Sequence, residues 1–157
     1  MKIKNITKAA IFFIFSFLWI GTIQSQNMGL KVDPRLKDVF SQQKIARLES
    51  EGSFKIAVYN YFLDHSYYLS DIAPENGKNM GSVSDLVLVN GEGHFQETID
   101  IFKNQSFNPY LYDIQIPYDT PIYYVIEEGK NYLIFYARGE YEANLAKYLN
   151  QEKIIIQ

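Results

Sequence analysis

The clearest pattern of hydrophobic and polar positions lies towards the C-terminal end of the chain. Two apolar runs, 122–126 and 132–136, flank a short polar segment that contains Gly129. Aromatic and β-branched runs separated by a glycine-bearing turn are typical of a β-hairpin. After Gly139 the apolar residues recur with the spacing of one helical face. These residues are Tyr141, Leu145, Tyr148 and Leu149. The sequence therefore predicts two strands followed directly by an amphipathic helix.

The N-terminal part of the chain also has a helical pattern. Asp33-Pro34 predicts a helix start, because Asp is a favoured N-cap and Pro a favoured first residue. One helical face then carries Leu36, Val39, Phe40 and Ala46. Ile45 and Leu48 lie off this face, so the helix is either buried on two sides or broken near Ser41. Glu51-Gly52-Ser53 ends it.

The next segment, 54–63, fits both a strand and a helix. Phe54, Ile56 and Val58 alternate as in a strand, and the residue types alone favour that interpretation. However, a strand here would continue almost unbroken through 66–72, well above the usual length of about 5–6 residues. We therefore predict a helix over 54–63 with Ser53 as its N-cap, and a strand over 66–72.

The middle of the chain predicts more strands. Residues 85–90 form one apolar run, and 95–102 alternates weakly after a glycine-rich turn. Residues 110–116 alternate cleanly up to Pro117. Short connections between successive strands argue against parallel pairing, which needs a long crossover. The predicted fold class is α+β: an antiparallel β-meander of about five to six strands, with N-terminal helices and a C-terminal helix packed on one face.

The first 25 residues have the organisation of a secretory signal peptide. Three lysines precede an apolar run of 12 residues at 9–20, and Ser25 is suited to cleavage before Gln26. The alternative is an uncleaved anchor, but the run is shorter than the ~20 residues that span a bilayer. We predict export to the periplasm or outside the cell, then a connector over 26–32 and a single domain over 33–157, with no membrane span in the mature chain.

Charge and cysteine usage narrow the functional classes. Cleavage removes three of the 15 Lys+Arg and none of the 18 Asp+Glu, so the mature chain has 12 positive and 18 negative residues, a net of −6. This balance argues against nucleic acid and against an anionic membrane surface as partners. The chain has no cysteine and therefore no disulfide, which suits a protein of a bacterial periplasm or outer surface better than a small eukaryotic secreted domain.

Candidate catalytic chemistry is confined to two histidines. His65 and His94 with a nearby carboxylate are a hypothetical metal site, but they are 29 residues apart and lack the local spacing of zinc ligands. Asp64-His65-Ser66 contains the residue types of a catalytic triad, yet neighbours in sequence seldom reach the required geometry. Two surface histidines in turns are the simpler interpretation, and no cofactor is predicted.

The 13 tyrosines are the unusual feature of the composition. Tyr67-Tyr68 and Tyr123-Tyr124 lie in predicted strands, and the pairs Tyr110/Tyr112 and Tyr132/Tyr136 extend the pattern. A row of these rings on one sheet face is a candidate recognition surface, because tyrosine combines a large contact area with a polar tip. Its partner would be a protein or a saccharide, although the only tryptophan, Trp19, lies in the leader. The alternative is that the tyrosines pack at the rim of the sheet.

These patterns lead to a function hypothesis and two alternatives. The hypothesis is a small exported binding or structural module of the bacterial envelope, without catalysis. Its candidate binding residues are Tyr67, Tyr68, Tyr123, Tyr124, His65 and His94. The first alternative is a small secreted hydrolase or metal-dependent enzyme that uses His65 and His94. The second is a subunit held in an envelope complex by Ile154–Ile156.

Overall fold

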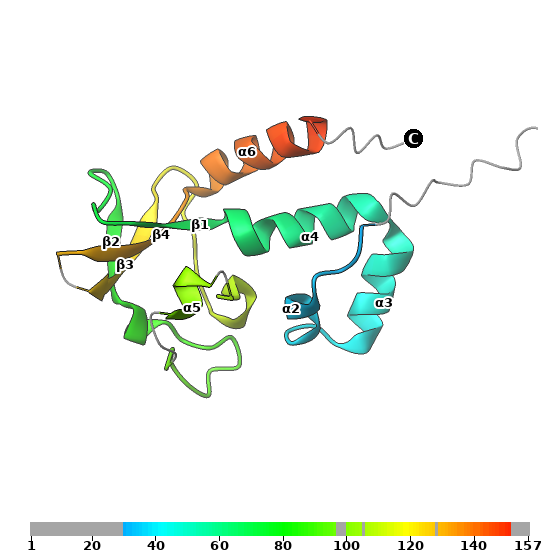
Figure 1. Ribbon diagram of the computed structural model, residues 1–157, viewed down its shortest axis with the longest axis horizontal. Coiled ribbons are helices and arrows are strands. Elements are labelled where there is room, and N and C mark those ends of the chain that lie inside the picture. The colour runs from blue at the N-terminus through cyan, green and yellow to red at the C-terminus, as the bar shows by residue number, and fades with distance from the viewer. Residues whose placement is uncertain (1–29, 97–99, 105, 128, 152–157) are drawn as a thin grey trace, which may run out of the picture.

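The computed structural model describes residues 30–96, 100–104, 106–127 and 129–151. The predicted leader, most of the connector and Ile154–Ile156 lie outside these residues. The described residues form five α-helices and a four-stranded sheet (Figure 1). The helices are α2 (Pro34–Lys37), α3 (Gln42–Glu51), α4 (Ser53–His65), α5 (Asp100–Lys103) and α6 (Arg138–Gln151). The strands are β1 (Tyr67–Ser70), β2 (Lys78–Ser82), β3 (Ile122–Glu127) and β4 (Asn131–Phe135).

The sheet is mixed, with strand order β1-β4-β3-β2. The predicted hairpin is confirmed: β3 and β4 pair antiparallel, and β1 adds antiparallel to β4. Strand β2 instead runs parallel to β3. The α+β class is therefore confirmed, but the prediction of five to six antiparallel strands is wrong. Residues 83–121 form the long crossover that a parallel pair requires.

The described part of that crossover contains none of the three strands that the sequence predicted there. It begins with the 3-10 turn η1 (Val83–Asp85), continues through α5, and includes a second 3-10 turn, η2 (Pro109–Leu111). Two isolated bridges, Val87 with His94 and Leu88 with Tyr112, are its only β-pairing among described residues. Several of the apolar residues that suggested strands, among them Leu86, Phe95 and Tyr112, are buried in the core, whereas Val87 and Val89 are exposed.

One face of the sheet carries the larger core, here called the sheet core. Ile122 and Tyr124 from β3 and Leu133 and Phe135 from β4 meet buried side chains of the crossover. The crossover contributes Val83, Leu86, Phe95, Phe102, Phe107 and Tyr112. Phe107 is central: its ring centroid lies 5.0 Å from that of Phe102 and 5.3 Å from that of Tyr112. Aromatic pairs at such distances add about 0.5–1.5 kcal/mol each beyond the burial of their area.

The N-terminal helices are positioned by local backbone signals. Of the two interpretations of 34–51, the structure has the break near Ser41: α2 ends before that residue, and the Ser41 side chain caps α3 by accepting from the Lys44 N–H. The predicted helix over 54–63 is confirmed as α4. Its N-cap is Gly52 and not Ser53. Gly52 has a φ of 96°, a value that favours glycine, so it forms the sharp joint between α3 and α4.

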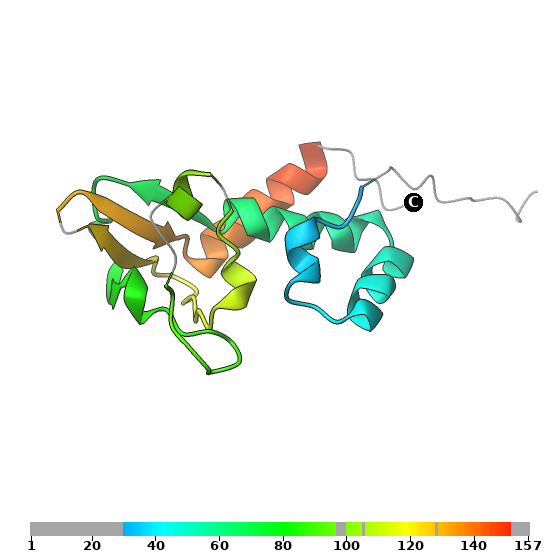
Figure 2. The same cartoon turned by 60° about the horizontal axis from the view of Figure 1, so that its bottom comes forward.

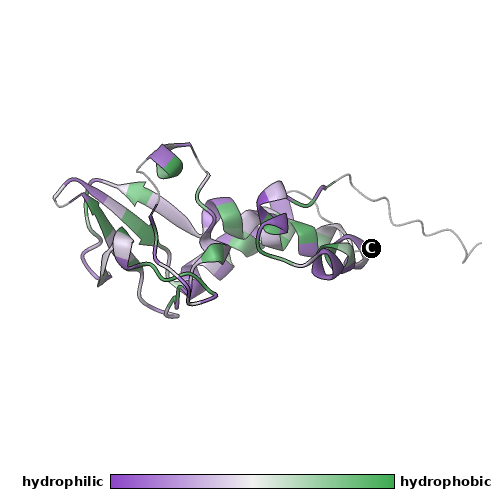
Figure 3. Ribbon diagram, turned by 90° about the horizontal axis from the view of Figure 1, so that it is seen from below, coloured by the Kyte–Doolittle hydropathy of each residue, from purple (hydrophilic) through white to green (hydrophobic). Residues whose placement is uncertain are grey.

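These helices enclose a second, mostly aliphatic core, here called the helical core. Its buried members are Val32, Leu36, Ile45, Ile56 and Leu63. Figures 1 and 2 show α2 and α3 at the end of the molecule opposite the sheet, with α4 leading from them to β1. The helices at this end alternate hydrophobic and hydrophilic stretches (Figure 3), as expected for elements that each bury one face.

The predicted C-terminal helix is confirmed as α6, but its position differs from the expectation. It leaves the sheet after β4 and runs beside α4 (Figure 1), where Tyr148 packs on Tyr61 with ring centroids 4.7 Å apart. None of the terminal helices contributes a buried residue to the sheet core. The crossover, and not these helices, covers that face. No helix in the described part of the chain has the length and apolarity to cross a membrane.

Candidate binding site on the sheet

Strand register divides the candidate tyrosines between the two faces of the sheet. Tyr67 is opposite Phe135, and Tyr124 is opposite Leu133, so both belong to the face that carries the sheet core. Tyr68 and Tyr123 are both opposite Ile134, on the other face. Because side chains alternate between faces along each strand, adjacent tyrosines point in opposite directions. The structure therefore does not place all four on one surface.

Two further tyrosines join the second face. Tyr132 is opposite both Ser70 and Val125 in the register, and Tyr136 follows β4 with its ring centroid 4.8 Å from that of Tyr68. We call this surface the tyrosine face, formed by Tyr68, Tyr123, Tyr132 and Tyr136. The rings of Tyr123 and Tyr132 are also in contact, edge to face at 5.7 Å.

The tyrosine face has a rigid support. Ile134 lies between the Tyr68 and Tyr123 positions and is only 1% exposed, whereas Tyr68 is 37% exposed. On the β2 side, Gly77 stands so close to Tyr123 that a Cβ there would be 3.1 Å from its Cδ1 atom. A packed aliphatic residue and a close loop therefore lie against the rings of the tyrosine face.

The hydroxyl groups of the tyrosine face have no hydrogen-bond partner among the residues that the structure describes. Burial raises the pKa of Tyr136, and the negative charge of Glu140 raises it further. Burial likewise raises the pKa of Tyr68, with contributions from Tyr136 and Glu140. A tyrosine hydroxyl can both donate a hydrogen bond to a ligand and accept one from it.

Tyr67 has a structural environment instead. Its ring meets Phe107 edge to face at 5.1 Å, and its hydroxyl donates to the Phe107 carbonyl at 3.5 Å. Burial raises its pKa, with a smaller contribution from Asp64. Tyr124 is buried and lies at 6.4 Å from Phe135. Tyr124 is therefore part of the sheet core, and Tyr67 packs against it.

The two histidines lie on separate elements with separate contacts. His65, at the end of α4, stacks on Tyr61 with centroids 4.2 Å apart and planes 3° from parallel. His94 is an exposed residue of the crossover, bridged to Val87. No group of three or more His, Cys, Asp or Glu in the described residues is arranged to hold a metal ion. Nothing in these contacts brings the two imidazoles into one site.

The neighbouring residues of His65 do not form a hydrogen-bonded triad. The Asp64 carboxylate accepts from Arg35 at 2.8 Å, and His65 Nδ1 lies 3.2 Å from the Tyr61 carbonyl oxygen. Ser66 is buried, and its Oγ has no hydrogen-bond partner among the described residues. Asp64 and His65 thus have partners outside the triplet and Ser66 Oγ has none, so the nucleophile–base–acid chain that catalysis needs is not assembled here.

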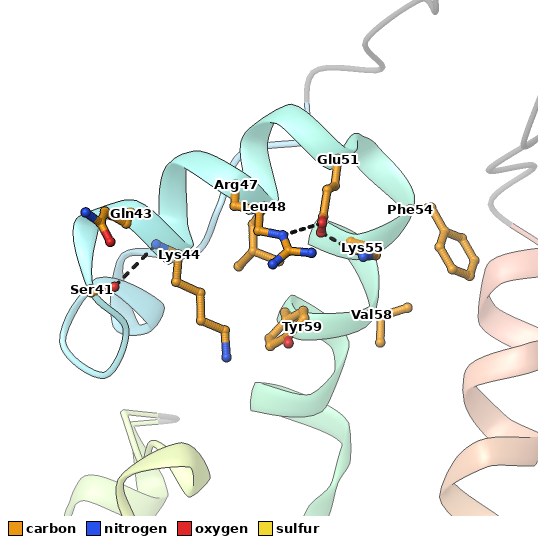
Figure 4. A pocket seen from close by; sticks show the side chains of 10 residues that line it. All are labelled: Ser41, Gln43, Lys44, Arg47, Leu48, Glu51, Phe54, Lys55, Val58 and Tyr59. Atoms are coloured by element: carbon orange, nitrogen blue, oxygen red, sulfur yellow. Dashed lines mark hydrogen bonds and ion pairs between the residues drawn. The ribbon is translucent and has the colours of Figure 1, made fainter.

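A second surface feature was not found from the sequence. Helices α3 and α4 border an open groove of about 700 Å³ that includes Lys44, Arg47 and Tyr59 (Figure 4). One signal was present: Lys44 follows Phe40 by four residues, a spacing at which side chains meet on a helix. However, α3 begins only after Ser41, so the Lys44–Phe40 contact depends on the tertiary structure.

No protein-family model, no curated protein and no solved structure matches this chain. Its function is therefore inferred from the surfaces described above.

Proposed function

We propose that this protein is a small exported binding module of the bacterial envelope, without catalysis, and that its ligand lies on the tyrosine face. The observation that carries the proposal is the group of Tyr68, Tyr123, Tyr132 and Tyr136 on the sheet face opposite the sheet core. Their rings touch in pairs, and their hydroxyls have no partner among the described residues.

The chemistry of this face suits a saccharide or a protein surface. Tyrosine offers a flat apolar ring and a polar rim while losing little conformational entropy on binding. A sugar ring has the matching combination of apolar C–H groups and hydroxyls, and tyrosine is also enriched at the centres of protein interfaces. The net charge of −6 for residues 26–157 supports a neutral or basic ligand and not a nucleic acid.

Binding is tested with the exported chain and two substitutions on the face, Tyr68→Ala and Tyr132→Ala. We expect each to weaken binding to the envelope polysaccharide or protein that the wild type retains by about tenfold or more, as for a residue at the centre of an interface. Tyr118→Ala is the matched control, because Tyr118 is 53% exposed but lies outside the tyrosine face. Equal affinities for all four proteins would refute the role of this face.

Export is tested separately, by fractionating cells that produce the full chain. We expect the protein in the periplasm or medium, shortened at the bond before Gln26. Replacing three leucine or isoleucine residues of 9–20 with lysine should keep it inside the cell and unprocessed, since an apolar core is what the export machinery recognises. Retention of the unchanged protein in the cytoplasm would contradict the envelope assignment.

A further inference from the structure

The groove between α3 and α4 has a cationic rim over an apolar wall. Lys44 and Arg47 project from α3 and Lys55 from α4, while Leu48 and Val58 line the wall between them (Figure 4). Its volume of about 700 Å³ lies in the range of about 300–1,000 Å³ that small-molecule sites occupy. Phe54 points away from the α3 side chains, towards α6 (Figure 4).

One carboxylate serves two of the three cations. Glu51 Oε1 accepts from Arg47 Nε at 2.6 Å, and Glu51 Oε2 accepts from Lys55 Nζ at 2.7 Å. These hydrogen bonds, from Lys55 first and then Arg47, hold the pKa of Glu51 below its usual range. The carboxylate is thus fully used by the two cations, and the groove has an excess of positive charge.

Lys44 is the cation that has no carboxylate partner in the described part of the chain. Its Nζ atom lies 3.8 Å from the ring centroid of Phe40 and 5.5 Å from that of Tyr59. Cation–π contacts at these distances hold the ammonium over the rings without neutralising it. The Lys44 ammonium is therefore held at the edge of an apolar wall with donors left for an anion.

The distribution of charge along the chain favours anions at this end. Residues 30–66, which form the helical end, contain six Lys and Arg against five Asp and Glu, a net of +1. Residues 67–151 contain five Lys and Arg against 12 Asp and Glu, a net of −7. An anion approaching the molecule is repelled by the sheet end and attracted to the helical end.

We propose that the α3–α4 groove binds a small anionic amphiphile, an organic acid whose charged group pairs with Lys44 and Arg47 and whose apolar part lies against Leu48 and Val58. Inorganic anions would leave the apolar wall unused, and a nucleic acid needs many more cations than this groove supplies. This site is independent of the tyrosine face and lies on different elements of the fold.

The test uses anilinonaphthalene sulfonate as the anionic probe and N-phenylnaphthylamine, its neutral counterpart, as the matched ligand. Fluorescence titration of the full exported chain gives the affinity of each. We expect Lys44→Gln to weaken binding of the sulfonate by about tenfold or more, the effect of losing a hydrogen bond to a charged group. Lys44→Arg should keep the affinity, because a guanidinium retains both the charge and the contact with the rings.

The control substitution is Lys37→Gln, which removes an exposed cation of α2 that does not line the groove. We expect it to leave the affinity within about twofold, since a distant surface charge is screened by salt. The neutral probe should bind more weakly than the sulfonate and should not distinguish Lys44→Gln from the wild type. Circular dichroism of each variant confirms that the fold is kept.

Three results would overturn the proposal: no binding of the sulfonate, equal affinities for wild type and Lys44→Gln, or an equal loss with Lys37→Gln. A fourth result that would overturn the proposal comes from the variant Tyr68→Ala. If that variant weakens sulfonate binding and Lys44→Gln does not, the probe lies on the tyrosine face and the groove proposal fails. Conversely, loss with Lys44→Gln alone supports the groove whether or not the tyrosine face has a ligand.

Discussion

The sheet end and the helical end are built from different residues and present different surfaces. The sheet core is dominated by aromatic rings around Phe107, whereas the helical core is mostly aliphatic around Leu36 and Leu63. The sheet end displays tyrosine hydroxyls within an acidic segment, and the helical end displays Lys44 and Arg47 beside an apolar wall.

This difference follows from how each end buries its residues. A sheet has two broad faces, and here the crossover covers only one, so β-strand tyrosines form the other. Helix α3 buries Ile45 and Leu48 on one stripe and carries charged residues on the remainder. It meets α4 at Gly52, and the two helices border the groove. The two ends thus present surfaces of unlike chemistry, and they are connected by α4 and by the contacts of η2 with α4.

The largest expected effect is at the centre of the sheet core. Phe107 is 1% exposed and contacts five other rings. We expect Phe107→Ala to lower the free energy of unfolding by about 3–5 kcal/mol, the usual cost of removing a buried aromatic ring. Denaturant unfolding measures it. Val89→Ala, at a crossover residue 64% exposed, should stay within about 0.5 kcal/mol. A loss below about 1 kcal/mol for Phe107→Ala would contradict the central role of this ring.

A smaller effect is expected in the helical core. Leu36 is fully buried on a helix of only four residues. We expect Leu36→Ala to cost about 2–3 kcal/mol, the lower part of the range for leucine, because so short a helix can shift into the space left behind. Hydrogen exchange should show faster opening of α3 amides than of β3 and β4 amides. Equal acceleration at both ends would mean that the two cores unfold as one unit.

Asn108 tests the connection between the two ends. Its Nδ2 donates to the Arg35 carbonyl of α2 at 2.8 Å, its Oδ1 accepts from the Tyr110 N–H at 3.1 Å, and the residue is 5% exposed. We expect Asn108→Ala to cost about 1–3 kcal/mol, because it removes two hydrogen bonds made by a side chain that is almost completely buried. Asn131→Ala, at the exposed first residue of β4, is the control. If the losses in the free energy of unfolding from Asn108→Ala and Leu36→Ala are additive in the double variant, the Asn108–Arg35 hydrogen bond does not couple the two ends.

The smallest effect concerns the carboxylate that caps α2. The hydrogen bond from the Arg35 side chain holds the pKa of Asp33 below its usual range, although partial burial opposes this shift. Because the folded-state pKa is lowered, the ionised group stabilises the fold above its unfolded pKa of about 3.9, and this contribution is lost as the pH falls towards the folded-state value. We expect a difference of about 1 kcal/mol between wild type and Asp33→Ala at neutral pH.

Comparing wild type with Asp33 variants across pH separates the contribution of the Asp33 charge from that of its capping hydrogen bond. Asp33→Asn keeps an oxygen for the Arg35 N–H but lacks the charge. The loss of stability of this variant relative to wild type should therefore shrink as the medium becomes acidic. Asp38→Asn, at the exposed other end of α2, should show a smaller deficit at every pH. Thermal unfolding at a series of pH values measures both. A deficit of Asp33→Asn that stays constant into acid would show that the ion pair with Arg35 is not its source.

Several elements were predictable because their signals are local. The β3–β4 hairpin follows from two apolar runs around Gly129, and α6 from the change of period after Gly139. The apolar spacing gave a break near Ser41 as one of two interpretations. The helix α4 was predicted because a strand over 54–72 would have been unusually long. The N-cap of α4 was predicted one residue too late, at Ser53, because serine is a favoured capping residue. In the structure the N-cap is Gly52, and its φ of 96° explains why glycine is needed there.

The sequence by itself thus determined the elements at the two ends of the chain and the abundance of tyrosine. Only the tertiary structure decided that the apolar runs at 85–90 and 110–116 pack on the sheet rather than pair in it, because their partners lie far away in sequence. It also decided that Tyr68 and Tyr123 share a face while Tyr67 and Tyr124 enter the core. A shift of one residue in strand register exchanges the two faces, and register is set by contacts between distant segments that no local pattern records.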